Sequence, residues 1–358
     1  MAVALENEDA GVVQDRPQHV SLSAPCGSVS RVRGVCSGLT CFIGVVLGMG
    51  CSGPQSALAP AGRGAEQLAE LFWVMAAGAV VVWLIVVGLG VYCLLRPESG
   101  SRRKAAIYII GGGVLFPTVV LAVLLVFGLS MLPAQVAPAP DGSLQITVTG
   151  YQWWWRVQYS SGGEVIELAN EIHLPVGEPV EFHLLSADVI HSFWIPSLGG
   201  KVDMIPGRRT RLTLHPTRAG VFRGTCAEYC GTSHALMSFY VVVEEKQDFR
   251  RWLDQQSQSA QTPASPLGLR GQKLFVTHGC GACHMVRGTA AGGKVGPDLT
   301  HVGSRLSIGA GILPNEPGSL SDWIERPDAV KPEAHMPHFA MLPPEDLRAL
   351  AAYLDSLK

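Results

Sequence analysis

Two cysteines four residues apart begin the stretch of sequence with the clearest capacity for chemistry. It reads Cys226-Ala-Glu-Tyr-Cys230-Gly-Thr-Ser-His234-Ala-Leu-Met237, and His191 lies 35 residues before its first cysteine. Thiolate, imidazole and thioether groups together favour copper over magnesium, calcium or manganese. A mononuclear blue-copper site uses one cysteine, two histidines and an axial methionine, so the second cysteine would let two thiolates bridge two copper ions. A Cys226–Cys230 disulfide and a zinc site are the competing interpretations, and neither explains His191 and Met237.

A second cysteine pair has the spacing of a covalent haem attachment motif. In Cys280-Gly-Ala-Cys283-His284, two thioether bonds would hold the porphyrin and His284 would be the proximal ligand of the iron. Gly271-Gln-Lys-Leu-Phe-Val precedes the motif and Gly296-Pro-Asp-Leu follows it, as in small class I cytochromes c. The sequence therefore predicts a haem c site near the C-terminus.

Met336 is the expected distal ligand of this haem. It is followed by Pro337 and lies before the terminal helix. A methionine ligand raises the potential of a histidine-ligated haem into the electron-transfer range. Met285 and Met341 are the other candidates. With both axial positions filled by the protein, the haem would carry electrons and would not bind oxygen.

The composition narrows the class of protein that carries these sites. The 358 residues have a formal net charge of −2, only 16% of them are charged, and the mean hydropathy is +0.25. Ordinary soluble proteins are about 25% charged. A nucleic-acid binder, a purely soluble single domain and a mainly disordered chain are therefore excluded, and the length allows two or three domains.

Two uncharged stretches, Leu71–Leu95 and Ala105–Leu132, are long enough to span a bilayer. Roughly 20 apolar residues cross a hydrocarbon core as a helix. We therefore expect a transmembrane hairpin within residues 51–140, with helices at about 69–95 and 105–132.

The residues at the ends of the hairpin set its orientation. The connecting loop contains one acid, Glu98, and the basic residues Arg96, Arg102, Arg103 and Lys104. The positive-inside rule places this loop in the cytoplasm and the rest of the chain outside. Pro117 should kink the second helix, because its ring removes one helical hydrogen bond.

Residues 1–50 are expected to be a leader and signal sequence. Their last part, Gly34–Gly50, is apolar, follows Arg31 and Arg33, and stands directly before Cys51. Cys51 would then be the lipidated first residue of the mature chain. Ordinary cleavage and an uncleaved anchor are the alternatives.

The remaining chain divides into a β-rich and a helical domain. Residues 141–250 contain short β-like runs separated by turn clusters, a pattern typical of a sandwich or barrel. Residues 251–266 predict a linker, because most of them belong to a stretch rich in Gln, Ser and Pro. Residues 267–358 are helical. The expected fold class is a multi-domain membrane protein with a two-helix transmembrane hairpin, a β-sandwich and an all-α C-terminal haem domain.

Residues 60–245 resemble subunit II of the haem–copper cytochrome c oxidases. The resemblance rests on the copper stretch and on three further motifs, Gly150-Tyr-Gln-Trp-Trp-Trp155, Asp188-Val-Ile-His-Ser-Phe-Trp-Ile-Pro-Ser-Leu-Gly199 and Lys201-Val-Asp-Met-Ile-Pro-Gly-Arg208. With a class I cytochrome c fused at its C-terminus, the chain resembles the caa-type oxidases over about residues 45–358. The resemblance implies a cupredoxin-like Greek-key domain that holds the binuclear copper A centre. Its implied ligands are His191, Cys226, the backbone carbonyl of Glu228, Cys230, His234 and Met237.

The resemblance also implies two roles outside the copper ligands. The Glu228 side chain would reach a magnesium or manganese ion at the border with subunit I, and Trp153 would be the aromatic residue through which an electron enters from an outside donor. The family often has a carboxylate near the start of the second transmembrane helix, at the mouth of a proton path. That start reads Ser101-Arg-Arg-Lys-Ala-Ala here, and Glu98 is not assigned the role.

Trp153 is expected to be exposed. By strand alternation, Trp153 and Trp155 share one face and Trp154 takes the other. Residues 150–190 carry six acids and one base, Arg156, which suits a basic protein donor, although an ordinary solvated surface has the same composition. We expect the haem domain, on a flexible linker, to dock near Trp153.

These features predict subunit II of a proton-pumping caa-type oxidase, a multi-pass protein of a bacterial plasma membrane whose copper and haem domains lie on the outer, periplasmic side. Electrons would pass from an external cytochrome c or its reductase to haem c, copper A and then haem a of subunit I. The oxygen site, which consists of haem a and copper B, also lies in subunit I. Subunit III is a further partner. The alternatives are a copper A and haem c protein that serves another reductase, such as nitrous oxide reductase, and a quinol oxidase subunit, whose relatives lose the cysteine pair.

Overall fold

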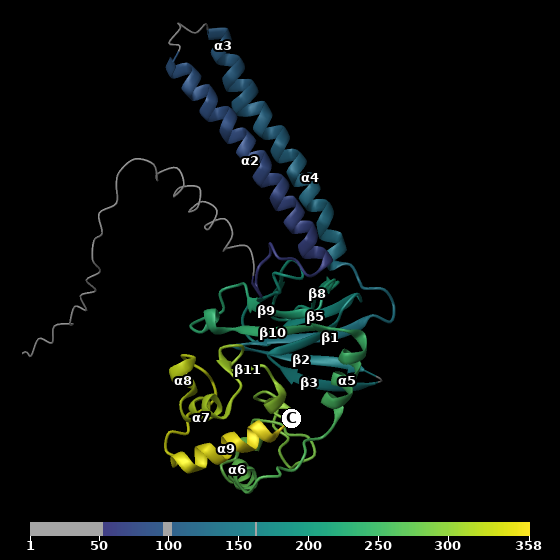
Figure 1. Ribbon diagram of the computed structural model, residues 1–358, viewed down its shortest axis with the longest axis vertical. Coiled ribbons are helices and arrows are strands. Elements are labelled where there is room, and N and C mark those ends of the chain that lie inside the picture. Colours follow the sequence, from purple (N-terminus) through teal and green to yellow (C-terminus); the bar gives the residue numbers. More distant parts are fainter. Residues whose placement is uncertain (1–52, 96–101, 162) are drawn as a thin grey trace, which may run out of the picture. The chain divides into compact units, whose positions relative to one another are not determined.

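The computed structural model describes residues 53–95, 102–161 and 163–358, and Figure 1 shows its elements. The chain divides into residues 1–50 and a compact unit, residues 51–358. The predicted leader, the lipidation candidate Cys51, and the loop residues Arg96 and Glu98 lie outside the described residues. All elements below belong to the compact unit.

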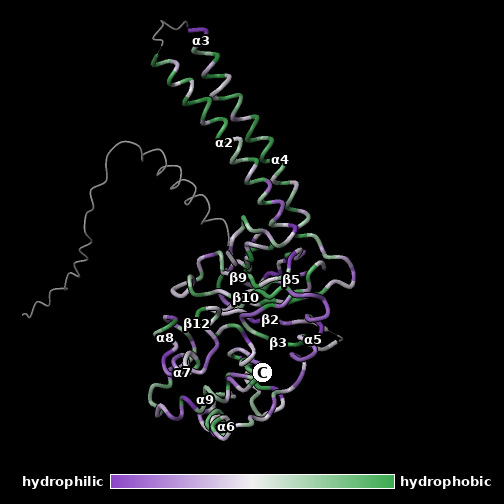
Figure 2. The backbone as a smooth tube through the Cα atoms, viewed as in Figure 1, coloured by the Kyte–Doolittle hydropathy of each residue, from purple (hydrophilic) through white to green (hydrophobic). Residues whose placement is uncertain are grey.

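Two long apolar helical segments come first. The first is α2 (Arg63–Leu95), and the second consists of α3 (Arg102–Ala106), the π-helical η1 (Ile107–Leu115) and α4 (Phe116–Val136). Both segments are long and apolar enough to cross a membrane. Figure 2 shows hydrophobic residues along most of their length. The two predicted spans lie within these helices.

The π-helical segment η1 ends just before Pro117, where the sequence predicted a kink. Pro117 has no N–H to donate, and the N–H of Phe116 bonds to the carbonyl of Gly111, five residues back. Prolines and π-bulges are both recognised causes of departure from a regular helix. The departure here is therefore a widened stretch that ends at the proline.

The start of α2 is bonded to the domain that follows the hairpin. The N–H of Ala61 donates to the carbonyl of Ser197 at 2.7 Å, and the N–H of Arg63 donates to the carbonyl of His215 at 3.0 Å. Ala61 and Ala65 are fully buried. The first turn of the helix thus takes part in the packing of the β domain.

Residues 144–244 form a cupredoxin-like β-sandwich of two five-stranded sheets. Most neighbouring strands are antiparallel, while β1/β5 and β4/β10 are parallel. The first sheet has the order β3 (Glu164–Ala169), β2 (Trp154–Ser161), β1 (Leu144–Tyr151), β5 (Val180–Ser186), β8 (Thr210–Leu214). The second has the order β4 (Glu171–Pro175), β10 (Ser238–Glu244), β9 (Gly220–Cys226), β6 (His191–Trp194), β7 (Val202–Met204).

Aromatic side chains from both sheets meet in the core of the sandwich. The ring of Trp155 on β2 lies 5.8 Å from that of Phe193 on β6 and 5.3 Å from that of Phe239 on β10. Phe182 on β5 lies 5.2 Å from Phe193. All four side chains are fully buried. This core fixes β6 and β10, which flank the predicted copper ligands.

The C-terminal domain is mainly helical and has its own core. Helices α6 and α9 pack together through Phe275 and Tyr353, whose ring centroids are 5.4 Å apart. A two-residue strand pair, β11 and β12, adds to the helices that the sequence predicted. The elements are α6 (Pro266–Thr277), η3 (Cys280–Ala282), η4 (Val302–Ser304), β11 (Ser307–Ile308), β12 (Leu313–Pro314), α7 (Pro317–Glu325), α8 (Pro327–Val330) and α9 (Pro344–Ser356).

The predicted linker, residues 251–266, is only partly a linker. Helix α5 (Lys246–Ser257) occupies its first half and buries Phe249 and Leu253 on the sandwich core. The following segment is bonded to the C-terminal domain, because the N–H of Ala260 donates to the carbonyl of Arg287 at 2.9 Å. The expectation of a flexible tether was wrong, since apolar side chains spaced along a polar stretch make an amphipathic helix.

Helix α5 also covers a buried histidine between two carboxylates. His173 on β4 lies 3.2 Å from Glu171 and 2.8 Å from Glu244, and its ring stacks on Trp252 of α5 at 3.8 Å. The other carboxylate oxygen of Glu171 accepts from the N–H of Leu306 in the C-terminal domain, at 2.7 Å. The cluster therefore joins the sandwich, α5 and the C-terminal domain.

Raising the pH is expected to weaken this junction. Burial alone lowers the pKa of His173, but hydrogen bonds and charges from Glu171 and Glu244 outweigh it, so the pKa is raised above its ordinary value of 6.5. Because the folded chain holds this proton more tightly, the contribution to stability is full below about pH 6.5 and is lost as the pH rises through the raised pKa. Denaturant unfolding at a series of pH values should show this fall in wild type. The free energy of unfolding should depend less on pH in His173→Gln. If it falls equally with pH in both proteins, His173 is not the group responsible.

Candidate metal centres

Strand ends bring the predicted copper ligands together. His191 is the first residue of β6, Cys226 is the last residue of β9, and the loop that follows returns through Met237 to β10. The pairing of Phe193 with Cys226 places the start of β6 beside the end of β9. The N–H of Cys226 donates to the carbonyl of Met237 at 2.9 Å and closes the loop.

The ligand atoms form two cysteine–histidine pairs around a close sulfur–sulfur contact. Cys226 Sγ lies 3.9 Å from His191 Nδ1, and Cys230 Sγ lies 3.5 Å from His234 Nδ1. The two sulfurs are 3.8 Å apart, whereas a disulfide bond is about 2.05 Å long. His191, Cys226 and Cys230 form a buried group that could hold a metal ion. Each histidine thus stands beside a different thiol.

The remaining two predicted ligands also lie at this group. The sulfur of Met237 is fully buried and 3.8 Å from Cys230 Sγ, and the carbonyl of Glu228 is 3.2 Å from Cys226 Sγ. The Glu228 residue itself is exposed. The donor set contains two thiols, two imidazoles, a thioether and a carbonyl, which fits a binuclear copper site better than a zinc site.

The two thiols hold their protons unequally. The pKa of Cys226 is lowered because Cys230 donates a hydrogen bond to its sulfur, and His191 and nearby backbone groups support the charge. The pKa of Cys230 is raised by the same contact. Metal ligands must be deprotonated, so binding would displace the proton that the two sulfurs share.

Asp188 and Gly150 support His191, and the sequence analysis named them only as members of family motifs, without a role. Asp188 lies 2.7 Å from Nε2 of His191, which leaves Nδ1 for the metal. A Cβ atom at Gly150 would lie 2.8 Å from the His191 ring, so only glycine fits there. The signals in the sequence for this contact were the three-residue spacing from Asp188 to His191 and their place in one motif.

The prediction that Trp153 is exposed was wrong. Its exposed fraction is 5%, because the C-terminal domain covers it: Lys331 bonds to its carbonyl, and the ring of His335 lies 6.0 Å from its own. The indole N–H donates to the carbonyl of Cys230 at 3.0 Å. We call residues 226–237, which contain most of the predicted copper ligands, the copper loop. Trp153 therefore links the copper loop directly to the surface that the C-terminal domain occupies.

The acidic residues of the 150–190 region whose side chains are described pair with groups of this chain. The five whose side chains are described all have partners within the chain. These contacts are Glu167 with Arg156, Glu171 with His173, Glu178 with Lys246, Glu181 with Arg211 and Asp188 with His191. The excess of negative charge is thus largely used in internal contacts.

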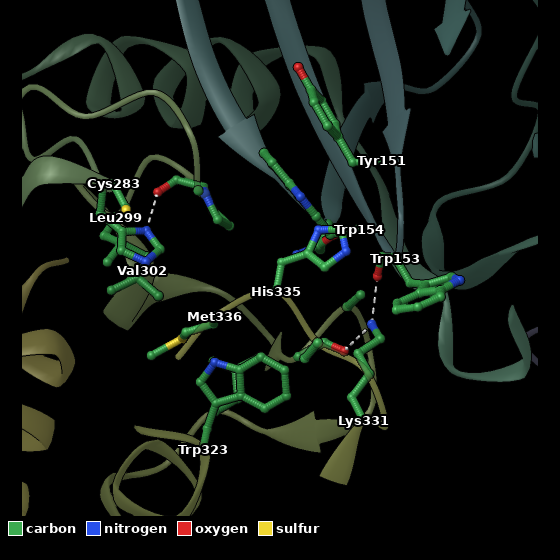
Figure 3. A pocket seen from close by; sticks show the side chains of 18 of the residues that line it. Tyr151, Trp153, Trp154, Cys283, Leu299, Val302, Trp323, Lys331, His335 and Met336 are labelled. Carbon is green, nitrogen blue, oxygen red and sulfur yellow. Dashed lines mark hydrogen bonds between the residues drawn. The ribbon is translucent and has the colours of Figure 1, made fainter. Parts of the chain in front are cut away.

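A cavity of about 420 Å³ lies beside the Cys280–His284 motif. Figure 3 shows Cys283 and Met336 on its wall, together with Trp153 and Trp154 from the β domain. His284 also lines it, and Nδ1 of that ring lies 2.8 Å from the carbonyl of Pro297, which leaves Nε2 for a metal. Both domains therefore contribute to one cavity.

The residues of this cavity fit a covalently attached haem. Burial lowers the pKa of His284, which favours the neutral ring that binds a metal. A Cβ at Gly296 would lie 2.5 Å from that ring. Arg305 Nε and Ser307 Oγ line the cavity wall as buried polar atoms without a hydrogen-bond partner among the described residues. Haem carries two propionate groups that accept hydrogen bonds, so buried donors such as Arg305 Nε and Ser307 Oγ suit a haem.

Among the three candidate distal ligands, the structure favours Met336. Its side chain lines the same cavity as His284, and it is partly buried. Met341 is 70% exposed, and neither Met341 nor Met285 is part of the cavity wall. Ligation by Met336 stays a prediction that this position supports.

Two family models match the two domains just described. Residues 160–245 match the periplasmic domain of cytochrome c oxidase subunit II, and residues 269–358 match cytochrome c. The chain is 40% identical over 243 residues to cytochrome c oxidase subunit 2 of Alkalihalophilus pseudofirmus, an alignment that covers 67% of this chain and 69% of the relative. The chain belongs to the cytochrome c oxidase subunit 2 family.

Other subunit 2 proteins are similar over a slightly smaller share. The alignment with cytochrome c oxidase subunit 2 of Bacillus subtilis has 32% identity over 228 residues and covers 61% of this chain and 63% of that relative. The crystal structure of the periplasmic domain of subunit II from Bradyrhizobium japonicum is 32% identical, with a TM-score of 0.32, and the match covers 34% of this chain and 96% of that domain. The chain thus spans about two thirds of the length of these curated relatives.

Membership of the subunit 2 family makes this chain a component of an oxidoreductase. The two matched domains imply copper A and haem c. The predicted copper ligands from Cys226 to Met237, and His191, lie within the first matched region, and Cys280, Cys283, His284 and Met336 lie within the second. The apolar helices and this family indicate a membrane-anchored protein with a periplasmic domain.

Proposed function

We propose that this chain is the electron-accepting subunit of a caa-type terminal oxidase. Electrons from an external cytochrome c or its reductase would pass through it to haem a of subunit I, where oxygen is reduced to water with proton pumping. When bound, haem c and two copper ions would supply centres that each take up one electron at a time. The chain itself holds these centres, orients them and keeps water from them.

The single observation that carries the proposal is the position of Trp153. Its side chain lines the haem cavity, and its indole N–H donates to the backbone carbonyl of Cys230. The thiol of Cys230 is one of the two predicted bridging ligands. The neighbouring Gln152 amide bonds to the same carbonyl at 2.8 Å. One short segment of chain therefore connects the two candidate centres, which is the arrangement that a relay of electrons requires.

The proposed partners follow from the exposed parts of the chain. The exposed Glu228 would reach a magnesium or manganese ion at the border with subunit I. The two apolar helices would contact lipid, subunit I and subunit III as a multi-pass anchor in the plasma membrane, with both metal domains on the outer side. Cys51 is the proposed lipidation site.

Metal analysis of the purified full-length chain tests the proposal. We expect two copper atoms and one iron atom per chain, a mixed-valence copper signal with a seven-line EPR pattern, and the absorption spectrum of a low-spin haem c. Rapid reduction of the haem should be followed by first-order reduction of copper in the same molecule. One copper atom per chain, zinc in its place, or reduction that depends on protein concentration would contradict it.

A further inference from the structure

Lys331 lies where the cytochrome domain meets Trp153. Its residue is 4% exposed, and its Nζ donates to the carbonyl of Trp153 at 2.6 Å and to the carbonyl of Gly309 at 3.1 Å. Figure 3 shows the Lys331 nitrogen with its two hydrogen bonds. Trp153 belongs to the β-sandwich, here called the copper domain, and Gly309 belongs to the C-terminal domain, here called the cytochrome domain. One side chain thus joins the backbones of both domains.

This ammonium is buried without an opposite charge. No carboxylate forms a salt bridge with Lys331 in residues 53–95, 102–161 and 163–358, and burial lowers its pKa to about 7. Taking a charged group out of water costs free energy that two carbonyl contacts only partly offset. An apolar side chain of the same length would avoid this cost, so the lysine here does something other than fill space.

The contacts of Lys331 continue to the copper loop. On its other side Trp153 donates to the carbonyl of Cys230, so Lys331, Trp153 and Cys230 form one connected series. The next residue of the cytochrome domain, Pro332, accepts a hydrogen bond from the fully buried Ser233 of the copper loop at 2.6 Å. The segment that begins at Lys331 therefore reaches the copper loop directly through Pro332 and indirectly through Trp153.

The same segment carries groups of the haem cavity. His335 packs against the Trp153 ring, and Met336 lines the cavity as the predicted distal ligand. A shift of Lys331 would therefore move Trp153 and Met336 relative to each other. Electron transfer depends on the distance and contact between the two centres, and Lys331 lies at the junction of the segments that carry both.

We propose that Lys331 is a positioning residue that holds the cytochrome domain against Trp153 for electron transfer within the chain. It acts through the Trp153 carbonyl and not as an electron carrier. The proposal rests on the proposed function, because it needs both centres to exchange electrons. It names a residue outside the predicted ligands and outside the motifs of the sequence.

Three full-length variants with both cofactors loaded test this role. Lys331→Met removes the donor at similar length, Lys331→Arg keeps a cationic donor, and Lys273→Met changes an exposed lysine of α6 as a control. After photoreduction of haem c, we expect copper reduction to be at least about tenfold slower in Lys331→Met, a change of about 1.4 kcal/mol in activation free energy. Lys331→Arg should recover most of the rate, and Lys273→Met should match wild type.

A second measurement separates positioning from simple loss of stability. The magnetic relaxation of the copper A signal by the ferric haem depends on the distance between them, and it should become weaker and more heterogeneous in Lys331→Met. Copper content, iron content and the haem spectrum should stay as in wild type. A wild-type rate with unchanged relaxation in Lys331→Met, or loss of cofactor in that variant, would overturn the proposal. If wild type itself transfers no electron between the centres, the proposed function is what fails.

Discussion

Replacing Cys226 or Cys230 by serine is expected to abolish the mixed-valence copper signal and to leave the haem c spectrum unchanged. Each thiol pairs with its own histidine and the two sulfurs are 3.8 Å apart, so a pair of copper ions bridged by both thiolates would lose a shared ligand when either sulfur is removed. A serine oxygen is a hard ligand with low affinity for copper in such a site. Turnover of the assembled oxidase with external cytochrome c should fall at least about a thousandfold, about 4 kcal/mol of activation free energy.

The haem should survive because its predicted ligands and attachment residues belong to a separate core. EPR and metal analysis of the full-length variants check the copper, and the reduced absorption spectrum checks the haem. Cys93→Ser, which changes an exposed cysteine of α2, is the matched control and should behave as wild type. A retained seven-line pattern in either cysteine variant would refute the bridging arrangement.

Trp153→Ala is expected to slow electron transfer into copper A far more than Trp154→Ala. Trp153 bonds to the carbonyl of Cys230, whereas Trp154 stacks on Tyr151 at 4.8 Å and lies under the guanidinium of Arg156. Of these two tryptophans, only Trp153 thus has a hydrogen bond to a predicted copper ligand. We expect a decrease of at least about tenfold, about 1.4 kcal/mol, with copper content unchanged.

Trp153→Phe separates the ring from its hydrogen bond. The ring remains but the N–H to Cys230 is lost, so the rate should lie between those of wild type and Trp153→Ala. Laser-induced reduction of the haem, followed at the copper A absorption band, measures the step in each variant. Equal rates in Trp153→Ala and Trp154→Ala would remove Trp153 from the pathway.

The candidate ligands of the two centres could be chosen from the sequence because ligand chemistry resides in residue type and spacing. The Cys226–Met237 stretch and the Cys280–His284 motif each lie on one short segment, and strand pairing brought only His191 from elsewhere. Hydropathy alone located both apolar helices, since their pattern spans some thirty residues in each. The positions of these elements needed no knowledge of long-range contacts.

The contacts between the two metal domains could not be predicted in this way. Burial of Trp153 and Lys331 depends on which surface the cytochrome domain covers, and no local pattern encodes it. Helix α5 was mistaken for linker because its buried side chains, Phe249 and Leu253, are few among polar residues. The acids of residues 150–190 suggested a docking face, and only their internal partners show where that charge is used.

The glycines beside His191 and His284, two of the three histidines predicted to bind a metal, limit how this chain can vary. Gly150 and Gly296 bear no functional group, yet a single methyl at either one would collide with an imidazole that must face a metal. Natural variants and random libraries should therefore lose copper or haem through alanine substitutions at these positions. A survey of metal-binding side chains alone would class both positions as tolerant of substitution, and so would miss two glycines on which the orientation of these imidazoles depends.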